Sequence, residues 1–298
     1  MRYYTLCLLV FISTYCLNMT FISIFYHRGI AHESVFLSAR LRRFVIVAGS
    51  WITGIDLKSW VCMHRMHHAY SDTLKDPHSP KRWGIFGTLI GQLISYNKTL
   101  RELDLKNPDY TAMVHDLDFD VNILNRKNIS MLPYAIQLAI AITCGWVFNC
   151  WLLGSAYFFG MMSHPIQGWL VNSFGHAVGY TNFDVSDDSR NNTLVAWLCF
   201  GEGYQNNHHR FPKSAKFSVR WFEFDMGYMV ANILARFGML KISKVNFTTS
   251  TTDGFGYWAE SMLFEVGANV APDLSPRNVS KMKFRSKIAN DRTAPSKI

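Results

Sequence analysis

Charged side chains are missing from two long stretches of the sequence. No Asp, Glu, Lys or Arg occurs in residues 3–26, and none occurs in residues 128–183. A helix that crosses a bilayer needs about 20 apolar residues, so the first stretch has room for one crossing and the second for two. A helix of a soluble protein without a polar face over this length would be unusual. The sequence therefore predicts an all-α integral membrane protein with a multi-pass topology.

A cleaved signal peptide is the alternative interpretation of the first stretch. Arg2 precedes it, but the apolar run is too long, and no small-residue cleavage site comes before His27. We therefore expect a retained helix over residues 3–26, with further spans at about residues 130–145 and 152–172. Residues 44–60 are apolar but are interrupted by Gly49, Gly54 and Asp56, which predicts an interfacial helix rather than a crossing.

These spans have consequences for topology. Two spans in the second stretch return the chain to the same side of the membrane, so the segments on either side can build one site. The single span before His27 favours a further helix ahead of Met1. We expect residues 1–271 to form one domain. Residues 272–298 are rich in Lys and Arg and are expected to form a basic, disordered tail, either solvated or near anionic lipid headgroups.

Spaced cysteine pairs and cofactor fingerprints are also missing. The six cysteines are scattered, and no C-x-x-C pair occurs, which argues against a disulfide framework and a thiolate zinc site. The sequence contains no G-x-G-x-x-G fingerprint, no haem-attachment motif and no ferredoxin cysteine pattern. Any redox reaction catalysed by this chain would therefore depend on an electron donor outside it.

Histidines, in contrast, are gathered in clusters. Of the eleven histidines, eight lie in four short boxes, which contain His27 and His32; His64, His67 and His68; His176; and His208 and His209. Residues three and four apart share a helix face, so His64 and His68 would point the same way. His27 and His32 are five apart and would converge best where the last turn of a helix loosens. The remaining three, His78, His115 and His164, are interpreted as packed or surface residues.

The number of imidazoles indicates more than one metal ion. Neutral imidazole binds iron, zinc, copper and nickel, and eight such groups exceed the needs of one tetrahedral zinc. Two metals with four or five ligands each fit the count better. A histidine-lined transporter pore is the competing interpretation, but its histidines would lie inside the spans, where only His164 is found.

The order of the boxes resembles that of membrane fatty acid desaturases, and is similar to their acyl-CoA (delta-9, stearoyl-CoA-like) branch. The motifs are H-x4-H, H-x-x-H-H, N-x-x-x-H and G-E-G-x-x-N-x-H-H, accompanied by Asp76-Pro77-His78. The resemblance covers about residues 4–212. It implies a bundle of three or four transmembrane helices whose cap, on the cytosolic face, holds a di-iron centre. It also implies an O2-dependent oxidoreductase that introduces a cis, delta-9-like double bond into a saturated acyl chain.

The resemblance further implies a set of metal ligands. One iron would be bound by five histidines, His27, His32, His64, His68 and His209. The other would be bound by His67, His176 and His208, with Asn172 reaching it through water. Gln205 stands where the family pattern has a ninth histidine. It is interpreted as a weak ligand or a holder of bound water, with a loosely held second iron as the alternative.

The resemblance also implies partners and leaves some alternatives open. We expect a long-chain acyl substrate, an external donor of the ferredoxin or cytochrome b5 type, and the lipid bilayer, but no nucleic acid. Trp60 and Trp169 are expected to line the acyl tunnel. Met63 stands where acyl-CoA desaturases have an acidic residue, so a lipid-bound or carrier-protein-bound acyl chain is an alternative to acyl-CoA. A membrane hydroxylase and a non-enzymatic metal-binding protein are the alternative functions.

Overall fold

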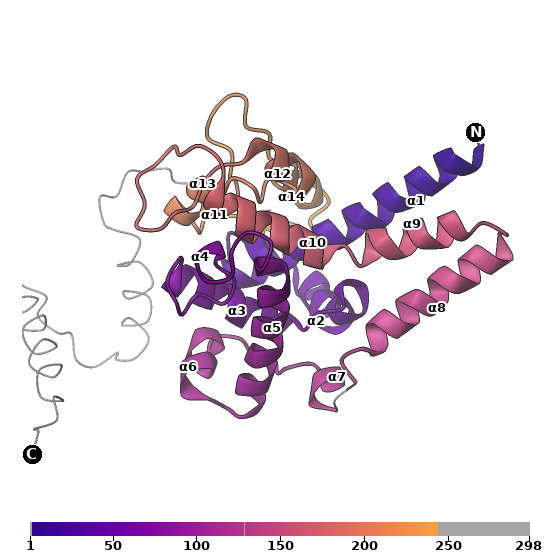
Figure 1. Cartoon of the computed structure of the whole chain (residues 1–298), viewed down its shortest axis with the longest axis horizontal. Helices are drawn as coiled ribbons and strands as arrows, with labels where there is room; N and C mark the ends of the chain where they lie inside the picture. Colours follow the sequence, from indigo (N-terminus) through magenta and orange to yellow (C-terminus); the bar gives the residue numbers. More distant parts are fainter. Residues whose placement is uncertain (1, 128, 244–298) are drawn as a thin grey trace, which may run out of the picture. The chain divides into compact units, whose positions relative to one another are not determined.

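The structure is a computed structural model that describes residues 2–127 and 129–243. This part of the chain is mostly helical (Figure 1). Its sheet is a short antiparallel ribbon in which β1 (Val35–Leu37) pairs with β2 (Leu240–Ile242). The prediction of a helical protein is confirmed for these residues. The domain boundary predicted at residue 271 and the basic tail lie outside them.

The first helix is long enough to cross a membrane. It begins as α1 (Arg2–Met19) and continues as a π-helix, η1 (Thr20–Ala31). In the part of the chain that the structure describes, Tyr3–Ala31 is the one unbroken helix that is long and apolar enough to span a bilayer. Only 33% of its most apolar window is buried within the protein, unlike the core helix of a soluble domain. This helix therefore fits the span that the sequence predicts at residues 3–26.

Residues 44–60, predicted as one interfacial helix, belong instead to two helices. α2 (Ala39–Thr53) and α3 (Leu57–Tyr70) meet at an angle of 86°. Gly54 ends α2 in a left-handed conformation, with φ of 78°, and the carboxylate of Asp56 accepts the backbone N–H of Ser59 at 2.7 Å to begin α3. Gly54 thus ends one helix and Asp56 begins the next, so this apolar segment forms two helices instead of one.

The second uncharged stretch forms a helical hairpin followed by a broken helix. α8 (Leu132–Val147) and α9 (Trp151–Met161) are antiparallel and α9 lies beside α1 (Figure 1). Small residues allow these close approaches, because a Cβ on Gly160 would collide with Thr14 and a Cβ on Gly154 with the backbone of Ala141. The outer surfaces of α8 and α9 expose large apolar side chains such as Trp146, as a lipid-facing surface does.

The span predicted at residues 152–172 is not one continuous helix. The chain breaks after α9 and resumes as α10 (His164–Trp169), η3 (Leu170–Phe174) and α11 (Gly175–Ala177). Pro165 lies in the first turn of α10, where its missing N–H is tolerated, but it cannot continue a preceding helix. α8 is also shorter than a full crossing, so the predicted total of three or four spans stays a prediction.

The full set of remaining helices is α4 (Pro80–Trp83), α5 (Thr88–Asp104), α6 (Pro108–Thr111), η2 (Ala112–Val114), α7 (Ile123–Arg126), α12 (Thr193–Leu198), α13 (Gln205–Arg210) and α14 (Met226–Arg236). Three of these helical segments pack against η1 or α3: α5 and η2 contact α3, and α14 contacts η1. The main core contains Tyr26 of η1, Val45 of α2 and Val61 of α3, all fully buried. Because the same helices carry the first two histidine boxes, this core fixes the boxes relative to each other.

Candidate metal centre

Five histidines from three segments converge in a first group. The group contains His27 in η1, His32 directly after it, His64 and His68 on α3, and His208 on α13. Their Nε2 atoms lie 2.7 Å apart for His32 and His64, 3.0 Å for His27 and His208, 3.0 Å for His68 and His208, and 3.1 Å for His64 and His68. The π-helix matters here, because its i to i+5 repeat places His27 and His32 on one face, with the N–H of His32 donating to the carbonyl of His27.

The first group has the donor arrangement that a metal ion requires. Nδ1 of His27 lies 2.6 Å from Oε2 of Glu202, and a carboxylate only accepts, so the proton is on Nδ1 and the lone pair of Nε2 points into the group. Nitrogens about 2.1 Å from one metal and at right angles to each other are about 3 Å apart. The observed separations match this value, and the five side chains therefore fit a metal ion.

Three further histidines form a second group next to the first. His67 comes from α3, His176 from α11 and His209 from α13, with ring centroids 4.8 to 5.1 Å apart. Their Nε2 atoms are buried and have no hydrogen-bond partner within the described ranges. Three imidazole nitrogens that face one another without partners, in a buried place, also fit a metal ion.

Each histidine of the second group is held by its own aspartate. Nδ1 of His67 lies 2.9 Å from Asp76, Nδ1 of His176 lies 2.8 Å from Asp72, and Nδ1 of His209 lies 2.6 Å from Asp187. These contacts fix the Nδ1–H tautomer, so each Nε2 keeps its lone pair for a metal. Carboxylate partners also raise the basicity of the ligand.

The three aspartates are ionised in this environment. Burial opposes the ionisation of Asp72, but hydrogen bonding and charge from His176 lower its pKa to about 2. The pKa of Asp76 and that of Asp187 are lowered too, against burial, by His67 and His209 respectively. Ionised carboxylates are the form that accepts from Nδ1–H, so the second group is surrounded by negative charge at neutral pH.

Two assignments of the ligands are corrected by the structure. The resemblance implied that His209 belongs to the first group and His208 to the second, and the structure places them the other way round. Neighbouring residues on a helix point about 100° apart, so these two rings must separate, but spacing does not say to which side each turns. That depends on the docking of α13, where the amide of Asn207 donates to the carbonyl of Phe217 and to Glu223.

Glu202 connects the first group to a buried charge network. Its Oε1 lies 2.6 Å from Nη1 of Arg28, which is fully buried, and Arg28 also pairs with Asp225 at 3.1 Å. The guanidinium lies over the ring of Phe217, 3.8 Å from its centroid. One glutamate thus contacts both a histidine of the first group and a buried arginine.

Sequence reasoning missed the four acidic partners. Glu202 belongs to the last box and Asp76 to the Asp76-Pro77-His78 motif, so a signal for these two was present. Asp72 and Asp187 have no such signal, because Asp72 reaches His176 across 104 positions and Asp187 lies 22 positions before His209. Only the tertiary structure brings these pairs together.

Gln205 and Asn172 lie next to the groups rather than within them. Gln205 is buried, and its amide donates to the backbone carbonyl of Glu202 at 2.7 Å, which leaves only its carbonyl oxygen as a possible ligand. Its side chain packs against Gly175, directly before His176. Both Asn172 and Gln205 line the cavity described next.

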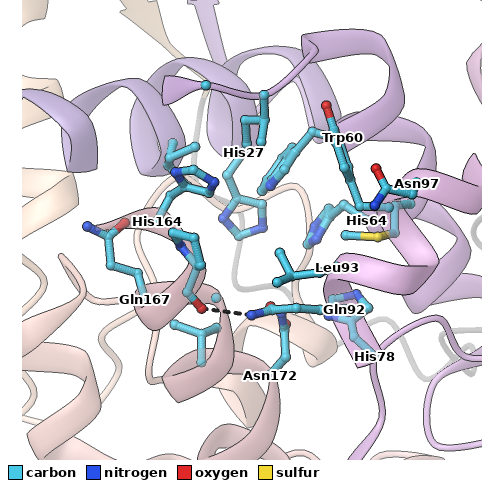
Figure 2. A pocket seen from close by; sticks show the side chains of 18 of the residues that line it. His27, Trp60, His64, His78, Gln92, Leu93, Asn97, His164, Gln167 and Asn172 are labelled. Atoms are coloured by element: carbon cyan, nitrogen blue, oxygen red, sulfur yellow. Dashed lines mark hydrogen bonds between the residues drawn. The ribbon is translucent and has the colours of Figure 1, made fainter. Parts of the chain in front are cut away.

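A cavity of about 370 Å³ reaches the first group. Figure 2 shows His27 and His64 at one wall, with Trp60 beside them and Gln92, Asn172 and His164 opposite. The ring of Trp60 stacks on that of His64 at 5.2 Å, so one of the two predicted tunnel residues lines the cavity. Apolar side chains such as Ile22, Ile55, Leu93 and Leu100 supply much of the rest of the wall.

Trp169 does not line this cavity. Its Nε1–H donates to the carbonyl of Ile85 at 2.7 Å, and its ring packs near Phe86. Residues of the same segment on either side of Trp169, among them Gly168 and Asn172, do line the cavity. Trp169 is therefore not placed at this cavity, because a helix turns successive side chains to different sides and the sequence did not fix its rotation; its role in an acyl tunnel stays a prediction.

The histidines outside the boxes have three different environments. His115 is exposed, and its Nδ1 lies 2.8 Å from the carbonyl of Ala112. His164 lies in the cavity wall with Nε2 3.1 Å from the hydroxyl of Tyr134. His78 is buried between the cavity and His67. Two of the three are thus placed beside the candidate site.

Comparison with known proteins identifies the family. The family model named fatty acid desaturase matches residues 4–240. The chain is 33% identical over 240 residues to the Hex-5-enoyl-[acyl-carrier protein] acetylenase of Moorena producens (strain JHB), covering 77% of this chain and 74% of that protein. It is 31% identical to the sn-1 stearoyl-lipid 9-desaturase of Synechocystis sp. (strain ATCC 27184 / PCC 6803 / Kazusa), covering 75% and 67% respectively. It is 29% identical to the acyl-CoA desaturase 1 of Saccharomyces cerevisiae (strain ATCC 204508 / S288c), covering 72% of this chain and 41% of that protein.

The chain therefore belongs to the fatty acid desaturase family and is an oxidoreductase of lipid metabolism. Enzymes of this family are associated with membranes, act on acyl substrates and generally use a di-iron centre and O2.

Proposed function

We propose that this enzyme introduces a cis, delta-9-like double bond into a saturated fatty-acyl chain, with O2 as co-substrate and two iron ions as cofactors. The observation that carries the proposal is the pair of buried histidine groups next to an apolar cavity. When bound, two redox-active irons supply the oxidising chemistry for an unactivated C–H bond, for which no side-chain base is strong enough. Zinc has no redox chemistry and would not supply it.

The two groups divide the ligands between the irons. The first iron would be held by His27, His32, His64, His68 and His208, and the second by His67, His176 and His209. Asn172 and Gln205 are proposed to hold water or to act as weak ligands at the cavity side. The aspartates that accept from Nδ1–H orient the second set of rings, and Glu202 orients His27.

The cavity is proposed to hold the acyl chain. Its apolar wall would exclude water from the bound chain. Trp60 lines the cavity and stacks on His64, so the bound chain would lie next to the first group. Met63 of α3 also lines the cavity and brings no charge to it. Acyl-lipid and acyl-CoA are the carriers that we propose, and the names of the relatives include both kinds.

The site is proposed to face the cytosol in a multi-pass membrane protein, and to receive electrons from a ferredoxin or a cytochrome b5. The basic residues proposed to dock an acidic donor are Lys81, Arg82, Arg210 and Lys213. Lys81 is 2.5 Å from Asp188, an exposed pair, so its charge is partly compensated. Docking would therefore depend on ionic strength.

Expression in a desaturase-deficient host tests the function. Fatty acids extracted from the lipid and CoA fractions are profiled by mass spectrometry, with His64→Ala as the inactive variant and His115→Ala as the matched control at an exposed histidine. We expect a product two mass units lighter with the native chain and with His115→Ala, but none with His64→Ala. A product sixteen mass units heavier would identify a hydroxylase instead. No product in any fraction, with metal uptake by proteoliposomes, would favour a non-enzymatic metal-binding protein.

A further inference from the structure

The exposed residues of the cavity wall mark where the cavity opens. Most residues that line the cavity are buried or half-buried, but Leu93, Asn97 and Met131 are exposed. Leu93 and Asn97 lie on α5 (Figure 2), and Met131 directly precedes α8. The opening therefore lies between α5 and the start of α8.

The helix on one side of this opening, α5, has polar side chains inside and apolar side chains outside. Four of its buried side chains are polar, those of Thr88, Gln92, Ser95 and Thr99. Each of these four donates a hydrogen bond to a backbone carbonyl of the protein. The large apolar side chains that α5 exposes are those of Ile90, Leu93 and Ile94. A surface helix in water has the opposite arrangement, so the outer face of α5 fits contact with lipid.

Charged residues show where this apolar surface ends. On α5 the exposed Ile94 is followed by Lys98 and Arg101, which are exposed too. Across the opening, the exposed Lys127 precedes the exposed Met131. Lys and Arg at the edge of an apolar surface are typical of the headgroup level of a membrane, where they meet phosphates. The opening thus fits the boundary between headgroups and acyl chains.

The part of the cavity wall near the opening carries polar groups without charge. Asn97 lines it from α5, and Asn125 and Ser130 line it from the chain before α8. Amide and hydroxyl groups can hydrogen-bond an ester carbonyl. Among the described residues, no Lys or Arg lines the cavity. Thioesters of coenzyme A and of carrier proteins bring phosphates, which proteins bind with Arg, Lys or helix N-termini. The wall therefore fits an ester better than it fits a phosphorylated carrier.

We propose that the cavity takes its acyl chain from a membrane glycerolipid, which enters sideways from the bilayer between α5 and the start of α8. This inference rests on the proposed function and chooses among the carriers that it allows. The acyl chain passes between Leu93 and Met131 towards the first histidine group, and its ester stays near Asn97 and Ser130. The apolar chain then moves from lipid to cavity without contact with water, and the headgroup remains among its neighbours.

Photo-crosslinking to the purified full-length chain tests this route of entry. The protein is reconstituted in phosphatidylcholine vesicles in which part of the lipid carries a diazirine on a stearoyl chain. In parallel, the same reactive chain is added to unlabelled vesicles as a coenzyme A thioester and as a carrier-protein thioester. After irradiation, mass spectrometry locates the adducts. We expect the lipid to label buried cavity residues such as Ile55 and Met63, and the soluble thioesters to label them at least about tenfold less.

A charge at the opening provides the variant for this experiment. Leu93→Glu places an unpaired carboxylate beside the entering chain, which is unfavourable next to apolar groups. Adducts at Ile55 and Met63 from the labelled lipid should fall at least about tenfold, whereas adducts on the outer surface of α8 should not change. Leu105→Glu is the matched control, because Leu105 is exposed at the C-terminal end of α5 and does not line the cavity. If Leu93→Glu does not fold, Met131→Glu on the opposite rim takes its place.

Two results would overturn the inference. One is that cavity adducts are missing with the labelled lipid, or are no more abundant than with the soluble thioesters. The other is that Leu93→Glu and Met131→Glu both keep the native level of cavity adducts.

Failure of this inference is distinguishable from failure of the proposed function, because crosslinking requires no turnover. If the native chain forms desaturated fatty acids but only soluble thioesters label its cavity, the function stands and the route from the bilayer fails. If lipid labels the cavity but no desaturated product forms in the host, the proposed function fails and the route stands.

Discussion

The two histidine groups differ in how they combine imidazole and carboxylate. The first brings together five imidazoles, and the ion pairs of the described residues link one of them, His27, to Glu202. The second brings together three imidazoles, and each is paired with a different aspartate. Glu202 also pairs with Arg28, a cation that it shares with Asp225, whereas the ion pairs of Asp72, Asp76 and Asp187 described above are with histidines.

This difference indicates two ways of stabilising a cation. The first group relies on the number of neutral ligands, and the second on anions one hydrogen bond further away. A carboxylate that accepts from Nδ1–H strengthens its histidine as a ligand and adds negative charge near the metal. We infer that the second group is more sensitive to the loss of a single ligand, and also to the loss of its carboxylates.

The largest effect is expected from removing a histidine of the second group. His176→Ala leaves only His67 and His209 in the second group. Metal content should therefore fall from two ions to about one per chain, and activity should fall at least about 100-fold. His32→Ala leaves four imidazoles in the first group and should retain more metal. Elemental analysis of both purified variants makes the comparison. Equal metal loss in the two would mean that ligand number does not distinguish the groups.

The next effect concerns the glutamate of the first group. In Glu202→Gln the fully buried Arg28 loses one of its two carboxylate partners, and breaking a buried ion pair costs about 3 to 5 kcal/mol. We expect a lower midpoint of thermal unfolding in the metal-free protein, measured by tryptophan fluorescence. If the variant unfolds like the native protein and only loses metal, Glu202 serves His27 alone.

A smaller effect is expected for an aspartate of the second group. Asp187→Asn keeps the shape of the side chain but removes the charge next to His209, and loss of such a partner typically costs 10-fold to 100-fold in metal affinity, about 1.4 to 2.7 kcal/mol. Iron titration should show the second site weakened and the first unchanged. Equal weakening of both sites would contradict the division into two groups.

The smallest effect is expected from an exposed pair near the second group. Lys81 and Asp188 are 2.5 Å apart but both are exposed, and such pairs contribute at most about 1 kcal/mol. Lys81→Ala should keep both irons and the native unfolding midpoint. Its activity with a donor protein should fall only if Lys81 takes part in docking. Loss of metal in this variant would mean that charges outside the histidine–aspartate pairs, such as that of Lys81, also influence metal binding by the second group.

Local spacing predicted part of this site, and the docking of helices decided the rest. His64 and His68 share a face because four residues make about one turn of an α-helix, and that follows from sequence alone. The exchange of His208 and His209 did not follow from spacing, since it depends on how α13 packs. Asp72 and Asp187 carry no local signal, because the fold alone brings them to their histidines.

The helices, like the site, were predicted in part: the sequence indicated where a long apolar helix lies, but not where helices break or bend. The first predicted span was recognised from its lack of charge, and the structure has a helix over Tyr3–Ala31 that is long and apolar enough to cross a bilayer. The break at 162–163 and the 86° bend after Gly54 were underestimated, because hydropathy averages over the very residues that end a helix. Pro165 and Asp56 were the informative positions.

The π-helix in Thr20–Ala31 also bears on the evolution of this segment. His27 and His32 share a face at a spacing of five, as His64 and His68 do at a spacing of four in an α-helix. A π turn differs from an α turn by one residue, so the length of this segment is constrained as strictly as its composition. If one residue between His27 and His32 were deleted, the two histidines would stay on one face only if this segment became an α-helix. Among homologous sequences, the spacing of the first box therefore reports the type of helix, and insertions or deletions there should be rarer than substitutions.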